Sequence, residues 1–296
     1  MNENTMKPID VSVIMVNYNS TNLLIDAVHS IFEQTRDVSF EIIVVDNASP
    51  DNGSGKIENE FRDSICIIKS EKNLGFGGAN NLGIKRAKGQ YLFFLNPDTL
   101  LLNNAIAKFK EYIESQENRK IGAVGGILLD REKKPTNSYH FFLTPSNVIA
   151  NVLRLQRTLQ MTEIKDPISV DFVTGAVLFV PLAVINDIGG FDERFFMYCE
   201  EVDLEKRMAD KGYMRMVIPG PRIIHFDGGS FIQKSKRSAR RRLTFDQSRL
   251  LYIRKHFGSV KYQCFKWMFL FCRIPAYLNY HYTFSENWQY FKNLLK

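Results

Sequence analysis

Acidic and amide side chains recur in this sequence directly after runs of apolar residues. Such side chains accept and donate hydrogen bonds and bind hard cations, but a single one usually caps a helix or forms a turn. Four such groups on one edge of a sheet favour a ligand-binding cleft. They are Asn17 and Asn19, Asp46 and Asn47, Asn73, and Asn96 and Asp98.

The segment Asn96-Pro97-Asp98-Thr99 follows a strongly apolar run. Pro97 restricts the backbone there, so that Asp98 can project from the end of the preceding strand. A divalent cation such as Mg²⁺ needs few protein oxygens when a diphosphate and water complete its shell. One aspartate could therefore hold such a cation. An ordinary turn is an equally good interpretation of this segment taken alone.

Three acids open a helical segment at Glu200, Glu201 and Asp203. The helix macrodipole stabilises carboxylates at a helix start, and Asp203 can pair with Arg207 one turn later. The preceding Phe195–Tyr198 forms an apolar wall, which can raise the pKa of a carboxyl group toward the range of a general base.

His225 ends an apolar stretch and precedes the turn residues 227–230. Most isolated histidines are structural or exposed. This position between a strand and a glycine turn suits a metal ligand or a phosphate donor.

The first hundred residues alternate apolar strands with helical segments. Because each strand is almost entirely apolar, we expect helices on both faces of a mostly parallel α/β sheet. Ligands then bind beyond the carboxyl ends of the strands, where the polar residues fall. The expected strands are 11–16, 42–45, 65–68 and 91–95, with helical segments over residues 23–31 and about 77–87.

The second half is less regular. It is expected to hold an apolar run at 122–128, a loop with short helical pieces over 131–165, and a strand over 172–180 interrupted at 174–176. A helix over 200–211, strand residues 217–224, a helix over 239–256 and an aromatic, basic region over 260–296 follow.

Composition excludes several classes of protein. The chain has 296 residues, 45% hydrophobic, and a net charge of +7, of which six charges come from Gln233 to Arg242. One local basic segment does not make a nucleic-acid-binding surface, so no nucleic-acid partner is expected. Four cysteines without a CxxC pair and a polar first ten residues predict a cytoplasmic protein without disulfides or a signal peptide.

Several nucleotide-dependent activities are disfavoured by missing motifs. No GxGxxG follows the first strand, and Asn80 takes the third glycine position in the similar segment 75–80. A GxxxxGK[ST] phosphate loop and a GxSxG nucleophile turn are also absent from the sequence. Hydride transfer, ATP hydrolysis and serine hydrolysis are therefore not expected.

In combination, these segments resemble inverting glycosyltransferases of family 2, and in particular the bacterial rhamnosyltransferase-like branch. Seven motifs occur in family order over residues 11 to about 231, about three quarters of the chain. They are VSVIMVNYNS, IIVVDNAS, KNLGFGGANNLGI, YLFFLNPDT, FVTGAVLFVP, GGFDERFFMYCEEVDL and IIHFDGGS.

The resemblance implies a GT-A fold, a nucleotide-diphospho-sugar donor, and Mg²⁺ or Mn²⁺ at Asp98, with His225 as a further ligand. It implies that Glu201 is the catalytic base, and because the family usually has Asp there, Glu200 and Asp203 are alternatives. Asn96 replaces the first acid of the family's DxD-like element. The implied nucleotide-binding residues are Asn17, Asn19, Asp46, Asn47, Asn73, Gly75, Asn80 and Asn96.

We expect a catalytic domain over 1–235, with a nucleotide-binding half to about residue 100 and an acceptor-binding half after it. A helical extension is expected over 236–296. The implied reaction moves L-rhamnose from dTDP-rhamnose, or a hexose from a UDP-sugar, onto a glycan or polyprenyl-linked glycan in cell-surface polysaccharide synthesis. A non-catalytic nucleotide-sugar binder and a sugar-phosphate nucleotidylyltransferase are the alternatives.

The basic segment and the C-terminal aromatic residues allow two further interpretations. They could attach the protein to the inner face of the membrane at anionic lipids, or the aromatic residues could simply pack on the catalytic domain. The basic residues could also close over the donor diphosphate or form a solvated loop. The aromatic residues are Trp267, Phe269, Phe271, Tyr277, Tyr280, Tyr282 and Trp288.

Overall fold

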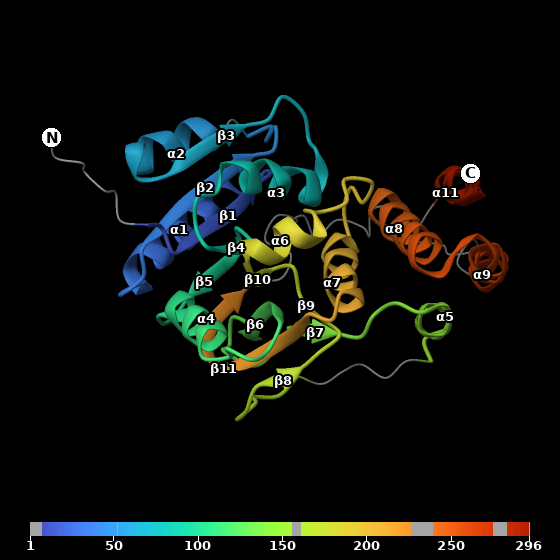
Figure 1. The fold of residues 1–296 in the computed structure, drawn as a ribbon. Helices are drawn as coiled ribbons and strands as arrows, with labels where there is room; N and C mark the ends of the chain where they lie inside the picture. Colours follow the sequence, from blue (N-terminus) through green and yellow to red (C-terminus); the bar gives the residue numbers. More distant parts are fainter. Residues whose placement is uncertain (1–7, 52, 156–160, 227–238, 275–282, 296) are drawn as a thin grey trace, which may run out of the picture.

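The computed structural model describes residues 8–51, 53–155, 161–226, 239–274 and 283–295. They form one large sheet with helices on both faces and a group of C-terminal helices beside it (Figure 1). Tyr277, Tyr280, Tyr282 and most of the basic segment lie outside the described residues. Within the described ranges, every helix is too short or too polar to cross a bilayer.

The large sheet has the strand order β3-β2-β1-β4-β10-β6-β11-β5, and β8 also pairs with β11. A second, small sheet pairs β7 with β9. The strands are β1 Val11–Asn17, β2 Phe40–Asp46, β3 Cys66–Lys69, β4 Tyr91–Leu95, β5 Thr99–Leu101, β6 Ile121–Leu129, β7 Tyr139–His140, β8 Ile168–Ser169, β9 Phe172–Val173, β10 Val177–Pro181 and β11 Met214–His225.

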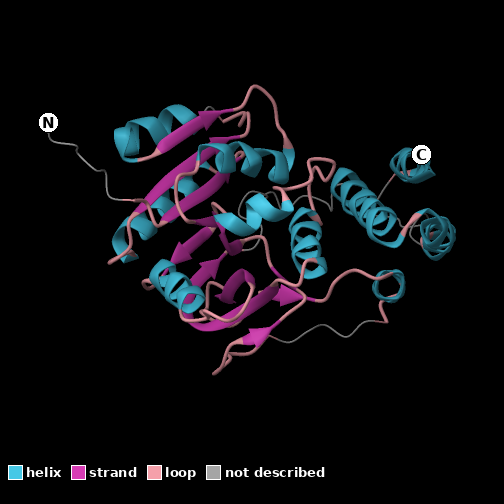
Figure 2. Cartoon of the chain, viewed as in Figure 1, coloured by secondary structure: helices cyan, strands magenta, loops and turns pink. Residues whose placement is uncertain are grey.

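The helices appear in cyan in Figure 2, which separates them from the strands by colour. They are α1 Thr21–Gln34, α2 Gly53–Phe61, the 3₁₀ turn η1 Arg62–Ser64, α3 Gly75–Arg86, α4 Ala105–Glu114, α5 Pro145–Val152, α6 Leu182–Ile188, α7 Glu200–Asp210, α8 Ala239–Phe257, α9 Ser259–Cys272 and α11 Phe284–Leu295.

The sequence prediction of a parallel sheet is confirmed for its first half. Strands β1, β2, β3 and β4 pair in parallel, as do β6 and β11. However, β10 runs antiparallel to both β4 and β6, and β11 is antiparallel to β5 and β8. The sheet is therefore mixed, with a parallel part over β3-β2-β1-β4 and antiparallel pairs around β10 and at the β5 and β8 edges.

Both faces of the sheet are covered, as the apolar strands predicted. Successive side chains of β1 alternate between the faces, so that Val13 and Met15 pack with Leu24 of α1, whereas Ile14 packs with Leu204 of α7 on the other face. Helices α1, α2 and α4 contribute to the first core, and α6 and α7 to the second.

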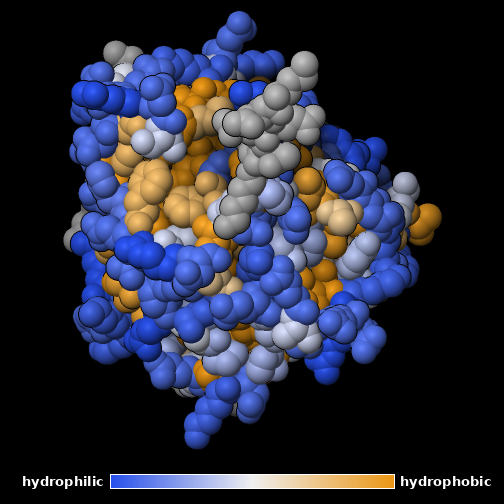
Figure 3. Space-filling view, turned by 60° about the vertical axis from the view of Figure 1, so that its left-hand side comes forward, coloured by the Kyte–Doolittle hydropathy of each residue, from blue (hydrophilic) through white to orange (hydrophobic). Residues whose placement is uncertain are grey.

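The C-terminal helices share a third core with the start of α7. Val202 of α7 packs in one apolar cluster with Tyr252 of α8, Phe269 of α9 and Tyr290 of α11. In Figure 1, α8 stands next to α7, and α9 and α11 lie on the far side of α8. Figure 3 shows another face of the molecule, where hydrophobic residues gather in recesses between hydrophilic ones.

Candidate active site

The ends of β1 and β2 place the first predicted site residues side by side. Asn17 and Asp46 are partners in the parallel register, and the backbone N–H of Asn47 donates to the carbonyl of Asn17 over 2.9 Å. Asn17 also holds the turn into α1, since its Nδ2 donates to Thr21 Oγ1 over 3.2 Å. Asn19, with a φ of 55°, stands at the rim of the same turn.

Asn47 joins this edge to the segment that precedes α3. Its Nδ2 donates to Asn73 Oδ1 over 3.1 Å and to the carbonyl of Gly75 over 3.2 Å, while its Oδ1 accepts from Leu74 N over 2.8 Å. Asn73 Oδ1 also accepts from Gly75 N over 2.9 Å. The amides of Asn47 and Asn73 therefore fix the loop that a nucleotide would border.

Gly75 and Asn80 are engaged in packing of α3. A side chain at Gly75 would lie 2.0 Å from the Phe196 carbonyl, which accepts from Phe76 N over 3.1 Å. The φ of Gly75 is also positive, at 75°, so only glycine fits there without strain. Asn80 is buried, and its Nδ2 donates to the carbonyl of Phe76. These residues hold α3 against the turn that leads to α7.

Asp98 and His225 form the next part of the site. β5 and β11 bring them together, because Thr99 and His225 are register partners and Phe226 N donates to the Asp98 carbonyl. Asp98 Oδ1 lies 3.4 Å from His225 Nε2, and both side chains are largely buried. The structure therefore places these two sequence-predicted metal ligands in contact.

The Asp98–His225 pair fits a divalent cation that shares its coordination with a substrate. A carboxylate oxygen and an imidazole nitrogen at this separation can bind the same ion, and a diphosphate and water would complete the shell. In the part of the chain that the structure describes, three or more metal-ligating side chains do not gather anywhere.

The base candidates lie at the start of α7, after two non-glycine residues with left-handed backbones. Tyr198 and Cys199 have φ values of 70° and 66°. Each such residue costs about 1–3 kcal/mol, and such strain is common at functional sites. The turn ends directly at Glu200 and Glu201, so its backbone geometry sets the directions in which these two side chains project from the helix.

Burial distinguishes Glu201 from Glu200. Glu200 is 4% exposed, and its Oε2 has no hydrogen-bond partner among the described residues. Burial and the neighbouring Glu201 raise the pKa of Glu200 well above its usual value. Burial also raises the pKa of Glu201, while backbone N–H groups at the helix start oppose the rise. Of these two residues, only Glu201 is partly exposed to solvent, and this makes it the better base candidate.

The turn between β9 and β10 connects Glu201 with the Asp98 segment. A Cβ placed on Gly175 would lie 3.3 Å from both Cβ and Cγ of Glu201. The next residue, Ala176, accepts from Asn96 N over 2.9 Å through its carbonyl. The base candidate and the segment that carries Asp98 therefore flank the same short turn, although they are about a hundred residues apart.

Asp203, the third acid, has a different environment. It is fully buried and accepts from Arg207 Nε over 2.9 Å, as the i,i+4 spacing predicted. It also pairs with Lys255 over 2.6 Å and His256 over 2.8 Å. Burial opposes ionisation of Asp203, but these partners outweigh it and lower its pKa. Asp203 thus anchors α8 to α7, which supports a structural role over that of an alternative base.

Glu205 is a buried acid that the sequence pattern did not single out. It follows Glu201 by one helical turn, has no exposed surface, and accepts from Val173 N over 2.8 Å. Burial raises its pKa well above the usual value. The signal in the sequence was an acid at an otherwise apolar position of α7, between Leu204 and Met208.

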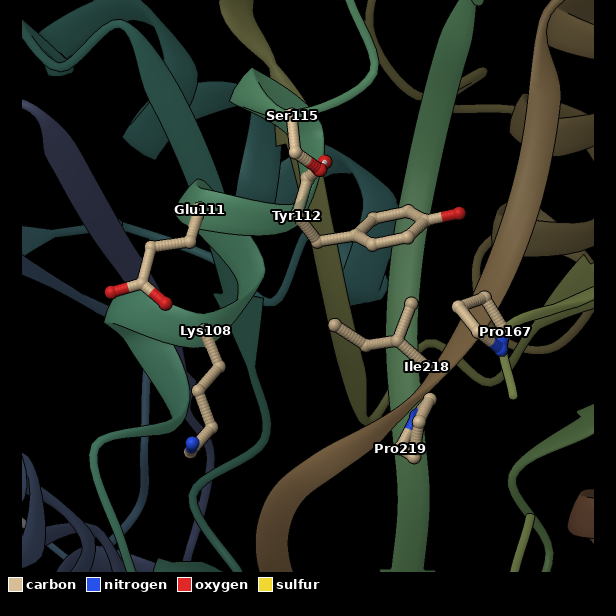
Figure 4. A pocket seen from close by; sticks show the side chains of 7 residues that line it. All are labelled: Lys108, Glu111, Tyr112, Ser115, Pro167, Ile218 and Pro219. Carbon is tan, nitrogen blue, oxygen red and sulfur yellow. Dashed lines mark hydrogen bonds between the residues drawn. The ribbon is translucent and has the colours of Figure 1, made fainter. Parts of the chain in front are cut away.

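The described surface includes hollows of different relation to the site. One, of about 300 Å³, includes His225 and Phe226 and belongs to the site region. Another, of about 370 Å³, lies between α4 and β11, where the Tyr112 ring faces Ile218 and Pro219 (Figure 4). None of the predicted site residues lines this second hollow.

Comparison with known proteins gives the family. The sequence profile described as "Glycosyl transferase family 2" matches residues 12–182, more than half of the chain. The chain belongs to glycosyltransferase family 2. The match contains Asn17, Asp46, Asp98 and the 174–176 turn.

Curated relatives include glycosyltransferases of bacteria and archaea. Rhamnosyltransferase WbbL of Escherichia coli is 28% identical over 178 residues, 55% of this chain and 66% of that protein. Low-salt glycan biosynthesis hexosyltransferase Agl10 of Haloferax volcanii is 28% identical over 203 residues, 66% of this chain and 60% of that protein. An uncharacterized glycosyltransferase of Rickettsia typhi is 30% identical over 204 residues, 69% and 59% of the two chains. The matches thus span about six tenths of these relatives.

Among solved structures, GalNAc-T7 with UDP, GalNAc and Mn²⁺ superposes with a TM-score of 0.64 and 16% identity, covering 97% of this chain and 55% of that one. At this identity the likeness shows the fold alone. The expectation of a GT-A fold with a helical C-terminal region is confirmed.

Proposed function

We propose that this glycosyltransferase moves a sugar from a nucleotide diphosphate to an acceptor hydroxyl with inversion at the anomeric carbon. The observation that carries the proposal is that Glu201 and the segment before Asp98 both contact the short 174–176 turn. A single displacement needs a base and a leaving-group site on opposite faces of the sugar, as inversion in glycosidases also does.

Asp98 and His225 would hold Mg²⁺ or Mn²⁺, which would neutralise the charge that develops on the leaving diphosphate. Support comes from their 3.4 Å contact and from the similarly folded GalNAc-T7, whose structure was solved with Mn²⁺. Glu201 would remove the proton of the acceptor hydroxyl as that oxygen attacks. Its burial raises its pKa toward the range of an efficient general base.

The nucleotide would lie over the ends of β1 and β2. There Asn17 and Asp46 would border the base and ribose, with the Asp46 carboxylate accepting from a pyrimidine imide. The loop fixed by Asn47 and Asn73 would border the diphosphate. Asn19, Gly75, Asn80 and Asn96 complete the proposed nucleotide-binding set, with Gly75 and Asn80 acting through the packing of α3.

For the donor sugar, similarity to rhamnosyltransferase WbbL favours dTDP-L-rhamnose. GalNAc-T7, whose structure was solved with UDP, supports UDP-hexoses as the alternative. A glycan or polyprenyl-linked glycan acceptor in cell-surface polysaccharide synthesis is supported by relatives such as Agl10, named for glycan biosynthesis.

A cytoplasmic location on the inner membrane face is proposed from the C-terminal helices. Phe269 is buried, whereas Trp267 is 63%, Phe271 73% and Trp288 51% exposed. One face of this region thus packs on the protein, as the packing alternative predicted, and another carries free aromatic side chains. Aromatic residues beside lysines, such as Lys292 over the Trp288 ring, suit the interface of anionic lipids.

The membrane proposal is tested with exposed residues, because deletion of 260–296 would also remove the buried Phe269 and Tyr290. The double variant Trp267→Ser/Phe271→Ser should lose cosedimentation with phosphatidylserine-containing vesicles while its melting temperature stays unchanged. Equal cosedimentation of variant and wild type would refute membrane binding through this face.

The proposed reaction is tested by a thermal-shift screen of nucleotide sugars with and without Mn²⁺ or Mg²⁺. A ligand at a hundredfold its Kd stabilises the folded state by about 2.7 kcal/mol. We expect a dTDP- or UDP-sugar to raise the melting temperature only with a divalent cation, and Asp98→Asn to abolish the cation-dependent part. A metal-independent shift that is equal in Asp98→Asn would refute the proposed cation site.

A further inference from the structure

The hollow beside His225 lies where β6 and β11 end next to each other. Leu129 and Ile224 are register partners, and both strands stop within one residue of this pair. The hollow has a volume of about 300 Å³, at the small end of the range of ligand pockets. Its lining residues are Asp130, Arg131, Glu132, Thr136, His225 and Phe226.

A hairpin turn carries four of these residues. Asp130 Oδ1 accepts from Glu132 N over 2.8 Å and from Lys134 N over 2.9 Å, which closes the turn. Arg131 projects from this turn with its guanidinium 5.0 Å from the centre of the Phe226 ring. The turn supplies a hydrogen-bond donor, and the residue after β11 supplies an aromatic ring, at the same hollow.

The hollow adjoins two parts of the candidate active site, the Asp98–His225 pair and the turn beside Glu201. On one side it contains His225, which contacts Asp98. On the other side Thr136 is followed by Ser138, whose carbonyl accepts from Thr174 N over 3.0 Å, directly before Gly175. Glu201 lies over Gly175, so the strand that leaves the hollow is hydrogen-bonded to the turn beside the proposed base.

The chemistry of the lining favours an uncharged, hydroxyl-rich ligand. Asp130 and Glu132 carry carboxylates that accept from hydroxyl groups, Arg131 donates, and Thr136 can do both. Glu132 pairs with Lys134 in the same turn, and Asp130 with Arg131 makes the second acid and base, so these four side chains have no excess of positive charge that would favour phosphate. The Phe226 ring supplies an apolar surface of the kind that lies against the C–H face of a sugar.

We propose that this hollow binds a sugar unit of the acceptor glycan, adjoining the unit whose hydroxyl is glycosylated. The proposal rests on the proposed transferase function and assigns the acceptor to the side of His225 where β6 ends. Thr136 and Arg131 select the acceptor by contacts that the donor does not make.

Saturation-transfer NMR tests this subsite without the transfer reaction. The full chain is mixed with methyl glycosides of rhamnose, glucose, galactose and N-acetylglucosamine. At least one glycoside should give a signal that falls fivefold or more in Arg131→Ala and in Thr136→Val. UDP with Mn²⁺ should not displace it. Lys133→Asn is the matched control, because Lys133 lies in the same turn outside the hollow and asparagine tolerates its φ of 60°.

Three results would overturn the subsite. These are the absence of a signal with every glycoside, equal signals in wild type and both hollow variants, and displacement of the glycoside by inorganic phosphate or by UDP with Mn²⁺. The thermal-shift screen for the donor is independent of this experiment. A chain that binds a nucleotide sugar but no glycoside here would refute the subsite alone.

Discussion

Gly175 offers a sharp test of how Glu201 is positioned. A methyl group added by Gly175→Ala would lie 3.3 Å from both Cβ and Cγ of Glu201, tighter than an ordinary contact, so the carboxyl-bearing side chain must move by a few tenths of an ångström. A misplacement of 1 Å in an active site can cost about 100-fold in rate, so a shift of about a third of that should lower kcat about three- to tenfold.

The assay is steady-state transfer by the purified full chain, using the donor identified by thermal shift. Donor KM should stay within twofold, because the three atoms nearest to the added methyl group all belong to Glu201. Gly55→Ala is the matched control, since Gly55 lies in α2 with open space around it and should keep its kcat. An unchanged kcat in Gly175→Ala, or a loss seen only in donor KM, would refute the reasoning.

Two other substitutions probe the support of α7. Asp203→Ala removes the buried carboxylate shared by Lys255 and His256, so the free energy of unfolding in denaturant should fall by about 3 kcal/mol; a change below about 1 kcal/mol would contradict the anchoring role. Glu205→Gln keeps an acceptor for Val173 N without an ionisable group. Burial raises the pKa of Glu205 in the folded state, so the contribution of this group to stability is greatest below its unfolded-state pKa and is lost as pH rises through its folded-state pKa. The melting temperature of the variant should therefore exceed that of wild type at pH 9 and equal it at pH 5. A difference independent of pH would refute this.

The sequence predicted the elements whose pattern is local. The four apolar runs became β1 to β4, and the runs before and after residues 174–176 became β9 and β10. Helix α2 was missed because only Ile57 and Phe61 mark its buried face among two glycines and several polar residues. The antiparallel direction of β10 was missed because strand direction depends on the connecting segment and not on the apolar run itself.

In the candidate site, too, local patterns could be predicted from the sequence and contacts between distant segments could not. The pairing of Asp98 with His225 was implied by the family resemblance, whereas the local pattern showed only that each residue follows an apolar strand. The pairing of Asp203 with Lys255 and His256 could not be predicted, since some fifty residues separate them and no local pattern records a contact between α7 and α8. The close approach of Gly175 to Glu201 likewise depends on how β9, β10 and α7 pack, which the motif alone does not show.

The central claim is that Glu201 acts as the base beside a cation-dependent donor site. The most direct measurement compares kcat of transfer in wild type and Glu201→Gln, with the donor thermal shift measured on both proteins. We expect kcat to fall by about 10² to 10⁴-fold while the cation-dependent donor shift persists. Transfer by Glu201→Gln at the wild-type rate would contradict the account.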